Sequence, residues 1–179
     1  TETKKIWREN SLITPDFEIY SDQSYEDLTK IYGSTFFIKD TCSGSSNNIF
    51  QIKNNGDFNH FIKNKNNRVF LIEKKISADE YTAAILNNRV LPIIKIIPSN
   101  EFYDFDAKYK SDKTKFLFPD LSSNMVSSIS DQVLRAFNVL GCNTWARVDF
   151  FIEDNTVILL EINTIPGMTD HSLVPKAAS

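Results

Sequence analysis

The sequence predicts an α+β fold in which strands follow one another through short turns. Apolar runs rich in Val, Ile and Phe recur between Gly, Asn, Asp and Pro residues, a pattern typical of strands. Residues 123–140 instead repeat apolar side chains at spacings of three and four, as in a helix packed on a sheet. The expected strands are 17–20, 35–39, 49–53, 69–73, 80–86 and 89–97, followed by one on each side of Asp154-Asn155.

The composition places the chain among ordinary globular proteins. Its 179 residues are enough for one domain or two small lobes, and 41% are hydrophobic and 24% charged. A net charge of −3 does not suggest a surface for nucleic acid. No apolar run approaches the roughly 20 residues that span a bilayer, so no membrane partner is expected.

The two cysteines and the start of the chain also limit the interpretation. Cys42 and Cys142 are far apart in sequence, which suits a reducing compartment and argues against a zinc site. We therefore expect a cytoplasmic protein. Residues 1–10 predict a mostly solvated helix, and the chain begins at Thr1 without a Met, which suggests that it is part of a longer protein.

Two pairs of polar residues stand out in the last two expected strands. Arg147 and Asp149 are two residues apart, as are Glu161 and Asn163, so each pair shares one face of its strand. Carboxylate and amide oxygens are ligands that Mg²⁺ accepts, so the pairs predict a magnesium site. An equally weighted alternative is a structural salt bridge from Arg147 to Asp149 or Glu161.

The turn between these strands sets a condition for the magnesium site. In a regular ladder, Asp149 and Glu161 share a face only if the turn contains an odd number of residues. A two-residue turn at Asp154-Asn155 would instead place Val148 opposite Glu161.

Two loop segments are candidates for ligand binding. Residues 40–48 form a Gly/Ser-rich connection between strands, whose N–H groups and hydroxyls could hold phosphate, although on composition alone an ordinary hairpin loop is more frequent. Residues 106–121 are polar and rich in Lys, and a loop of that length is usually either functional or disordered.

One stretch is far more specific than its spacing. Arg147-Val-Asp149, followed by Leu160-Glu161-Ile-Asn163-Thr-Ile-Pro-Gly167-Met-Thr-Asp-His-Ser172-Leu173-Val-Pro, resembles the C-terminal signature of D-alanine–D-alanine ligases, members of the ATP-grasp superfamily. The resemblance implies two α+β lobes with antiparallel-rich sheets that sandwich a nucleotide. The implied parts are a connecting helix from a missing N-terminal domain at 1–16, a small lobe at 17–75, and a large lobe at 76–179 that carries the metal and acceptor sites.

The resemblance also implies residues that bind ATP. Lys4, Lys39 and Lys108 match lysines that contact the phosphates. Glu73, Lys74, Lys75 and Ile76 match the segment that reads adenine, and Glu80 matches the carboxylate that holds the ribose. The other matched ATP-binding residues are Ser46 of the glycine-rich loop, Phe102 near adenine, and Leu160. Ser45 of the same loop and Tyr109, which would hydrogen-bond Ser45, match catalytic residues. Asn47-Asn48 depart from the family pattern, in which an apolar residue and a glycine follow the serines, but Asn tolerates the left-handed backbone.

The implied reaction is the ATP-dependent ligation of two D-alanines through an acyl phosphate, for peptidoglycan precursor synthesis. Asp149, Glu161 and Asn163 would hold two Mg²⁺ ions, with Mn²⁺ as a substitute. Arg147 and the Gly167 N–H would stabilise the oxyanion. Ser172 and the Leu173 N–H would bind the second D-alanine, and the full-length protein would be a homodimer.

Two alternatives stay open. The chain could belong to a different ATP-grasp ligase that joins other carboxylates to amines, such as a D-alanine–D-lactate or D-alanine–D-serine ligase, because the residues that discriminate could lie in the missing domain or in the lid that residues 106–121 would form. The chain could also be a non-catalytic nucleotide-binding module, an interpretation that the Asn47-Asn48 departure and the short chain favour.

Overall fold

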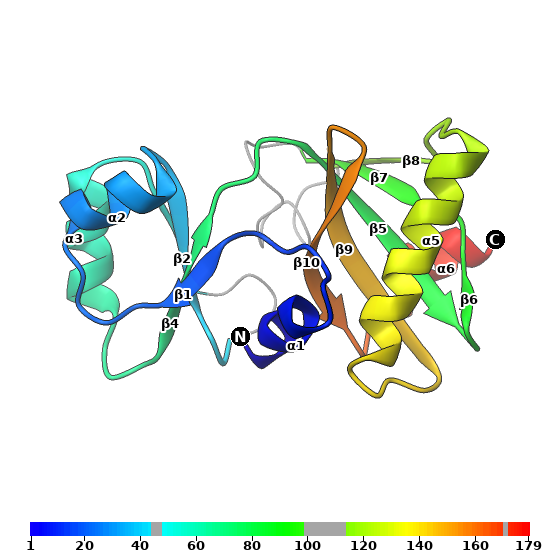
Figure 1. Cartoon of the computed structure of the whole chain (residues 1–179), viewed down its shortest axis with the longest axis horizontal. Helices are drawn as coiled ribbons and strands as arrows, with labels where there is room; N and C mark the ends of the chain where they lie inside the picture. The colour runs from blue at the N-terminus through cyan, green and yellow to red at the C-terminus, as the bar shows by residue number, and fades with distance from the viewer. Residues whose placement is uncertain (44–47, 99–113, 170–171) are drawn as a thin grey trace. The chain divides into compact units, whose positions relative to one another are not determined.

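The computed structural model describes residues 1–43, 48–98, 114–169 and 172–179 (Figure 1). The chain divides into two compact units, one formed by residues 15–77 together with Thr1, and the other by residues 2–14 and 78–179. The division falls after Ser77, two residues beyond the expected boundary. Residues 2–14 belong to the second unit and do not form a separate segment.

The first unit is a four-stranded antiparallel sheet with two helices. Its elements are β1 (Phe17–Ile19), α2 (Tyr25–Tyr32), β2 (Phe36–Asp40), β3 (Ile49–Ile52), α3 (Asn55–Asn64) and β4 (Phe70–Lys74). The strand order is β1-β4-β2-β3. Each helix begins at a polar cap, because Ser24 Oγ accepts from the Asp27 N–H at 3.1 Å and Asn54 Oδ1 accepts from the Asp57 N–H at 3.0 Å.

Both helices of the first unit cover the same face of its sheet (Figure 1). The core between them is aromatic and aliphatic, with several edge-to-face ring pairs centred on Phe61. Its buried members are Leu28, Tyr32, Phe36, Ile38, Ile52, Phe58, Phe61, Phe70 and Ile72. Side chains that alternate with these, such as Lys39 and Glu73, therefore lie on the face without helices.

The second unit contains a six-stranded antiparallel sheet. Its elements are α1 (Glu2–Glu9), β5 (Asp79–Leu86), β6 (Arg89–Val90), β7 (Ile94–Ile97), β8 (Lys115–Leu117), α5 (Ser123–Asn138), β9 (Trp145–Glu153), β10 (Thr156–Asn163) and α6 (Leu173–Ala178). The strand order is β10-β9-β5-β7-β8, and β6 pairs with β5. Asn87 and Asn88 form the expected turn with φ of 49° and 60°.

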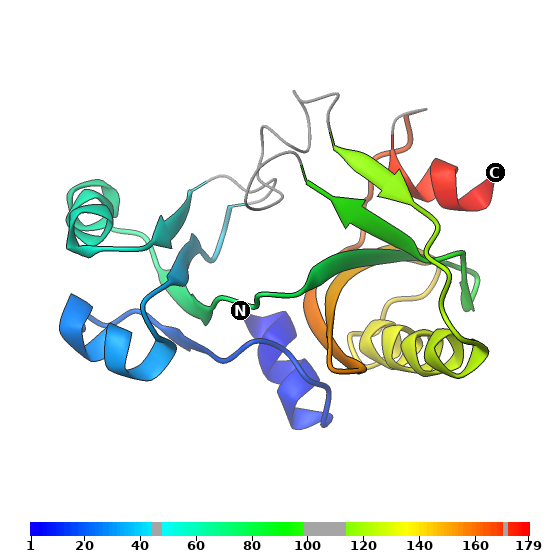
Figure 2. The same cartoon turned by 90° about the horizontal axis from the view of Figure 1, so that it is seen from above.

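Helices pack on both sides of this second sheet (Figure 2). On one face, α5 and α1 bury the larger core with Ala83, Val148 and Phe150. On the other face, α6 packs on Ala84, Ile94 and Ile96. The expected strand 89–97 is interrupted at residues 91–93, which include Pro92, a residue that lacks the N–H a ladder needs.

Two expectations about the helices need correction. The N-terminal helix is not mostly solvated, because Trp7 is fully buried and its Nε1 donates to the Ala136 carbonyl at 3.0 Å. Val126, which the apolar stripe of residues 123–140 includes as a core residue, does not join the core, since it lies in the first turn of α5 and is 41% exposed. The sequence pattern could not show either fact, because both depend on what the helix packs against.

Candidate active site

The polar residues predicted from the last two strands lie together on one face of the second sheet. Asp149 on β9 pairs directly with Glu161 on β10, and Arg147 pairs with Asn163. Asp149 also pairs with Thr82 on β5, and Glu80 lies two residues further along that strand. Residues opposite one another in a ladder share a face, and this is the α6 side of the sheet, where Ala84 contacts the helix.

A bulge produces this alignment, and the expected condition on the turn is wrong. The turn has two residues, because Glu153 pairs with Thr156 and Asp154-Asn155 have φ of 49° and 62°. A regular ladder would then place Val148 opposite Glu161. The register instead shifts by one residue between Leu159 and Glu161, so that Leu160 is the extra residue and Glu161 lies opposite Asp149.

Asp149 is held by charge and by hydrogen bonds. Its side chain is fully buried, and Arg147 donates from Nε to Oδ1 at 2.9 Å and from Nη2 to Oδ2 at 2.8 Å. The Thr82 hydroxyl donates to Oδ1 at 2.6 Å. A buried carboxylate requires such compensation. The salt bridge that the sequence left as an alternative is therefore present, and it fixes the orientation of Asp149.

The donors on this face are oxygen atoms of the kind that Mg²⁺ accepts. Within the described ranges, no three His, Cys, Asp or Glu side chains gather to hold a metal ion. Asp149 and Glu161 supply two carboxylates, and Asn163 adds an amide oxygen that accepts from the Ile165 N–H at 3.2 Å. Mg²⁺ commonly takes one or two carboxylates and completes its shell with water and substrate phosphates.

The loop before α6 brings Gly167 and Ser172 together. A Cβ on Gly167 would lie 2.9 Å from Ser172 Oγ, so a larger residue at this position would require the Ser172 side chain to shift. Ser172 Oγ accepts from the Thr169 N–H at 3.1 Å and lies 2.9 Å from the Thr169 hydroxyl. Leu173, the first residue of α6, is buried against the sheet.

The predicted nucleotide residues of the first unit form an ion pair. Lys39 on β2 donates to Oε1 of Glu73 on β4, and their side chains are 22% and 2% exposed. The register causes this contact, because Phe37 pairs with Glu73 and Lys39 with Leu71, which puts Lys39 diagonally across from Glu73. Lys74 is exposed, whereas Lys75 and Ile76, which follow β4 in the chain, are half-buried.

Lys4 and Leu160 occupy less expected positions. Lys4 is only 7% exposed in α1, and its Nζ donates to Thr14 Oγ1 at 2.9 Å. Leu160 is the half-buried extra residue of the bulge. The remaining predicted residues lie outside the described residues, and they are Ser45, Ser46, Phe102, Lys108 and Tyr109.

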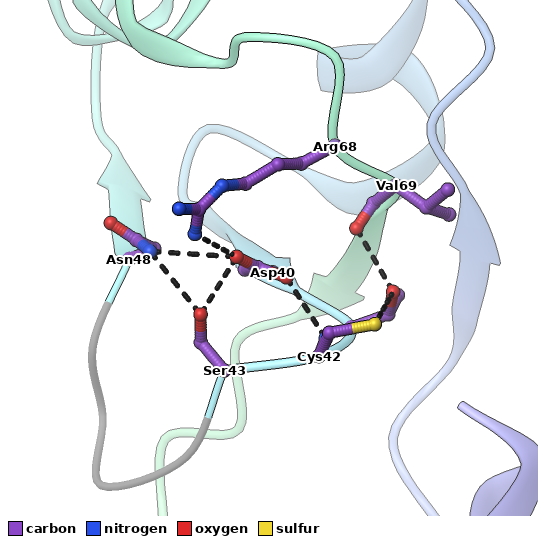
Figure 3. Close-up of polar contacts among 7 residues, drawn as sticks. Asp40, Cys42, Ser43, Asn48, Arg68 and Val69 are labelled. Atoms are coloured by element: carbon purple, nitrogen blue, oxygen red, sulfur yellow. Dashed lines mark hydrogen bonds and ion pairs between the residues drawn. The ribbon is translucent and has the colours of Figure 1, made fainter.

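Sequence reasoning missed a polar network at the end of β2 (Figure 3). Asp40 accepts from the Cys42 N–H at 2.9 Å, from Ser43 Oγ at 2.7 Å and from Arg68 Nη1 at 2.6 Å. The Cys42 N–H, then Ser43 and then Arg68 hold the pKa of Asp40 well below its usual range. An acidic residue directly before a Gly/Ser-rich loop was the available signal.

The two units and the polar sheet face define a class of protein. Over 98% of this chain, the fold superposes on a crystal structure of D-alanine–D-alanine ligase from Bacillus anthracis, with a TM-score of 0.83, 30% sequence identity and 59% of that chain covered. A second structure from that organism, complexed with ATP, matches with a TM-score of 0.80 and 27% identity and covers 57% of that chain. The fold is therefore ATP-grasp, as the sequence predicted.

The sequence comparisons identify the family. Residues 10–179 match the family described as "D-ala D-ala ligase C-terminus", and the chain belongs to this family of ATP-dependent ligases. D-alanine–D-alanine ligase of Dechloromonas aromatica is 38% identical over 98% of this chain and 60% of its own length. The chain thus spans about 60% of the curated relatives it matches. No helix among the described residues is long and apolar enough to cross a membrane.

Proposed function

We propose that this chain carries the ATP site, metal site and acceptor site of a D-alanine–D-alanine ligase that serves peptidoglycan precursor synthesis. The observation that supports this most is the alignment of Asp149 with Glu161 and of Arg147 with Asn163 on one sheet face. A two-residue turn alone would not produce that alignment, and the bulge at Leu160 does.

Asp149, Glu161 and Asn163 are the residues that would hold magnesium. Two bound Mg²⁺ ions, or Mn²⁺ in their place, would offset the phosphate charge of ATP. Arg147 fixes the orientation of Asp149 through its two hydrogen bonds. Arg147 also lies opposite Asn163 in the ladder, beside the proposed metal ligands. In that position its charge stabilises negative charge that develops on the substrate.

The nucleotide contacts would come from several elements. In the first unit, Lys39 binds phosphate and Glu73, Lys74, Lys75 and Ile76 bind the adenine edge. In the second unit, Lys4 binds phosphate, Glu80 binds the ribose hydroxyls and Leu160 contacts the cofactor. The ion pair of Lys39 with Glu73 supports placing the proposed phosphate contact of Lys39 next to the proposed adenine contact of Glu73. Ser45, Ser46, Phe102, Lys108 and Tyr109 complete the proposed set.

The acceptor site would be the loop between β10 and α6. The Gly167 N–H stabilises the oxyanion, while Ser172 and the Leu173 N–H bind the carboxylate of the second D-alanine. The close approach of Gly167 to Ser172 Oγ supports this assignment, because it places both groups within one tight loop. The amine of that D-alanine attacks the acyl phosphate of the first, and inorganic phosphate leaves.

Calorimetric titration of the 179-residue chain with ATP tests the nucleotide and metal sites. We expect binding with Mg²⁺ that is lost in EDTA, and we expect Glu161→Ala to remove the Mg²⁺-dependent part. Glu153→Ala is the matched control, because Glu153 is an exposed glutamate at the other end of the same hairpin. ATP binding that is equal with and without Mg²⁺ in a folded sample would refute the metal assignment.

The acceptor requires a separate assay in the longer protein. We expect phosphate release from ATP to depend on D-alanine and to be lost in Asn163→Ala. The VanG D-Ala:D-Ser ligase from Enterococcus faecalis has the same fold, with a TM-score of 0.79 and 24% identity, so D-serine is the comparison substrate. Faster release with D-serine than with D-alanine would reassign the acceptor.

A further inference from the structure

Ser172 precedes α6 at the position of a helix cap, yet its hydroxyl does not cap the helix. A serine at this position commonly accepts from the N–H of the second or third helical residue. The third residue of α6 is Pro175, which has no N–H, and the Ser172 side chain makes no capping bond. The half-buried Ser172 hydroxyl is therefore available for a different partner.

The Ser172 side chain is bonded to Thr169 instead. Ser172 Oγ accepts from the Thr169 N–H at 3.1 Å and lies 2.9 Å from Thr169 Oγ1. The backbone joins the same two residues, because the Ser172 N–H donates to the Thr169 carbonyl at 2.8 Å. Of these three contacts, the one between the two hydroxyls is the contact that requires the threonine side chain.

The hydrogen of each hydroxyl can be shared in two ways. A serine oxygen has one hydrogen to donate and two lone pairs that accept. The Thr169 N–H occupies one lone pair of Ser172 Oγ. If the Thr169 hydroxyl occupies the other lone pair, the single hydrogen of Ser172 is left to donate to a ligand.

A carboxylate beside Ser172 would select this second arrangement. A hydrogen bond to a charged acceptor is roughly twice as strong as a bond between neutral groups. The Ser172 hydrogen would therefore go to the carboxylate and not to Thr169, and the Thr169 hydroxyl would donate to Ser172 Oγ. The two bonds then form a chain in which each polarises the next, and the contacts from Thr169 hold the Ser172 side chain in one of its staggered rotamers.

We propose that Thr169 is a positioning residue for the acceptor, and that its hydroxyl donates to Ser172 Oγ and directs the Ser172 hydrogen toward the carboxylate of the second D-alanine. This inference rests on the proposed function, in which Ser172 binds that carboxylate. Thr169 does not touch the substrate. It acts through Ser172.

Steady-state kinetics of the longer protein, followed through phosphate release at saturating ATP, test this role. Thr169→Val keeps the size of the side chain and the N–H bond to Ser172 but removes the hydroxyl. We expect the KM for D-alanine as the acceptor to rise about fivefold, while kcat and the KM for ATP stay within about twofold of wild type. Such a split is expected because the carboxylate is not the reacting group, so its contact is the same in the ground state and in the transition state.

Two single variants complete the comparison of side chains. Thr169→Ser keeps a hydroxyl at this position, and we expect it to retain the wild-type KM for the acceptor. Thr156→Val is the matched control, because Thr156 lies at the other end of β10, away from the loop that contains Thr169. We expect this control to leave the KM for the acceptor unchanged.

A double-mutant cycle with Ser172→Ala decides whether Thr169 acts through Ser172. We expect Ser172→Ala to raise the KM for the acceptor by at least about tenfold, because the lost bond is to a charged group. Thr169→Val should then add no further rise in the Ser172→Ala background, because the group through which it acts is absent.

The outcomes separate this inference from the proposed function. A rise in the acceptor KM of Thr169→Val that is absent in Thr169→Ser, and absent in the Ser172→Ala background, supports the positioning role. An unchanged acceptor KM in Thr169→Val, an equal rise in both backgrounds, or a parallel rise in the KM for ATP overturns the inference and leaves the acceptor site in place. An acceptor KM that Ser172→Ala does not change overturns the proposed acceptor site and the inference with it.

Discussion

The Arg147–Asp149 ion pair allows a quantitative test of whether the charges serve stability or ligand binding. Arg147→Met removes two short charged hydrogen bonds from a carboxylate that is 0% exposed. Breaking one side of a buried pair typically costs 3–5 kcal/mol of unfolding free energy, and we expect about 3 kcal/mol because Thr82 still donates at 2.6 Å. Arg147→Met with Asp149→Leu removes both charges, and we expect unfolding free energy within about 1 kcal/mol of wild type.

Tryptophan fluorescence during urea unfolding measures this effect in one unit alone. The chain has two tryptophans, and both Trp7 and Trp145 belong to the second unit, which contains the ion pair. The double variant leaves no orphaned hydroxyl, because the one hydrogen of Thr82 Oγ1 can turn from Asp149 to the Val148 carbonyl, 3.3 Å away. Tryptophan fluorescence therefore reports the unfolding free energy of the second unit without contributions from the first unit.

The same variants distinguish the two roles of the charges. We expect the double variant to fold like wild type and to lose Mg²⁺-dependent ATP binding, because Asp149 is a proposed ligand. A loss below about 1 kcal/mol in Arg147→Met would refute the reasoning about the buried pair. Full Mg²⁺-dependent binding by the double variant would instead show that the charges are structural only.

Three other outcomes follow from the structure. Folding lowers the pKa of Asp40, so the charge of Asp40 stabilises the fold fully above the pKa of an unfolded carboxyl, about 4, and this stabilisation is lost as the pH falls below that value. The difference in unfolding free energy between wild type and Asp40→Asn should therefore shrink in acid, as measured by urea unfolding followed through amide signals of the first unit. Gly167→Ala places a Cβ 2.9 Å from Ser172 Oγ and should cost about 1 kcal/mol in thermal unfolding, a loss that adding Ser172→Ala relieves; equal costs in both backgrounds would contradict the contact. Burial raises the pKa of the Cys142 thiol, so at pH 8 maleimide should label it more slowly than exposed Cys42 in the folded chain, and at similar rates in urea.

Local patterns were sufficient to predict most elements of the fold. The turn at Asn87-Asn88 and the turn at Asp154-Asn155 form where residues that tolerate positive φ separate two apolar runs. The helix 123–140 is observed as Ser123–Asn138, and its stripe of apolar side chains faces the sheet from Ile129 onward. These features depend on residues that are near one another in sequence, which is why the sequence could reveal them.

Features that depend on distant partners could not be predicted. The burial of Trp7 requires Ala136, and the contact of Lys39 with Glu73 requires the register of two strands that a helix separates in sequence. The bulge at Leu160 has no signature, because leucine is compatible with a regular strand and with a bulge alike. The metal-site residues were therefore predicted from their spacing and from the resemblance, and the other site residues from the resemblance alone. The geometry of the site came from the structure.

The bulge determines where the hairpin of β9 and β10 can change length. Because Leu160 is an extra residue in β10, a chain that lacked it would run as a regular ladder from the turn onward and still place Glu161 opposite Asp149. Loss of a residue between Glu161 and Asn163 would separate these two ligands onto opposite faces. Leu160 is thus a position at which the deletion of one residue leaves every other side chain of the hairpin on its own face.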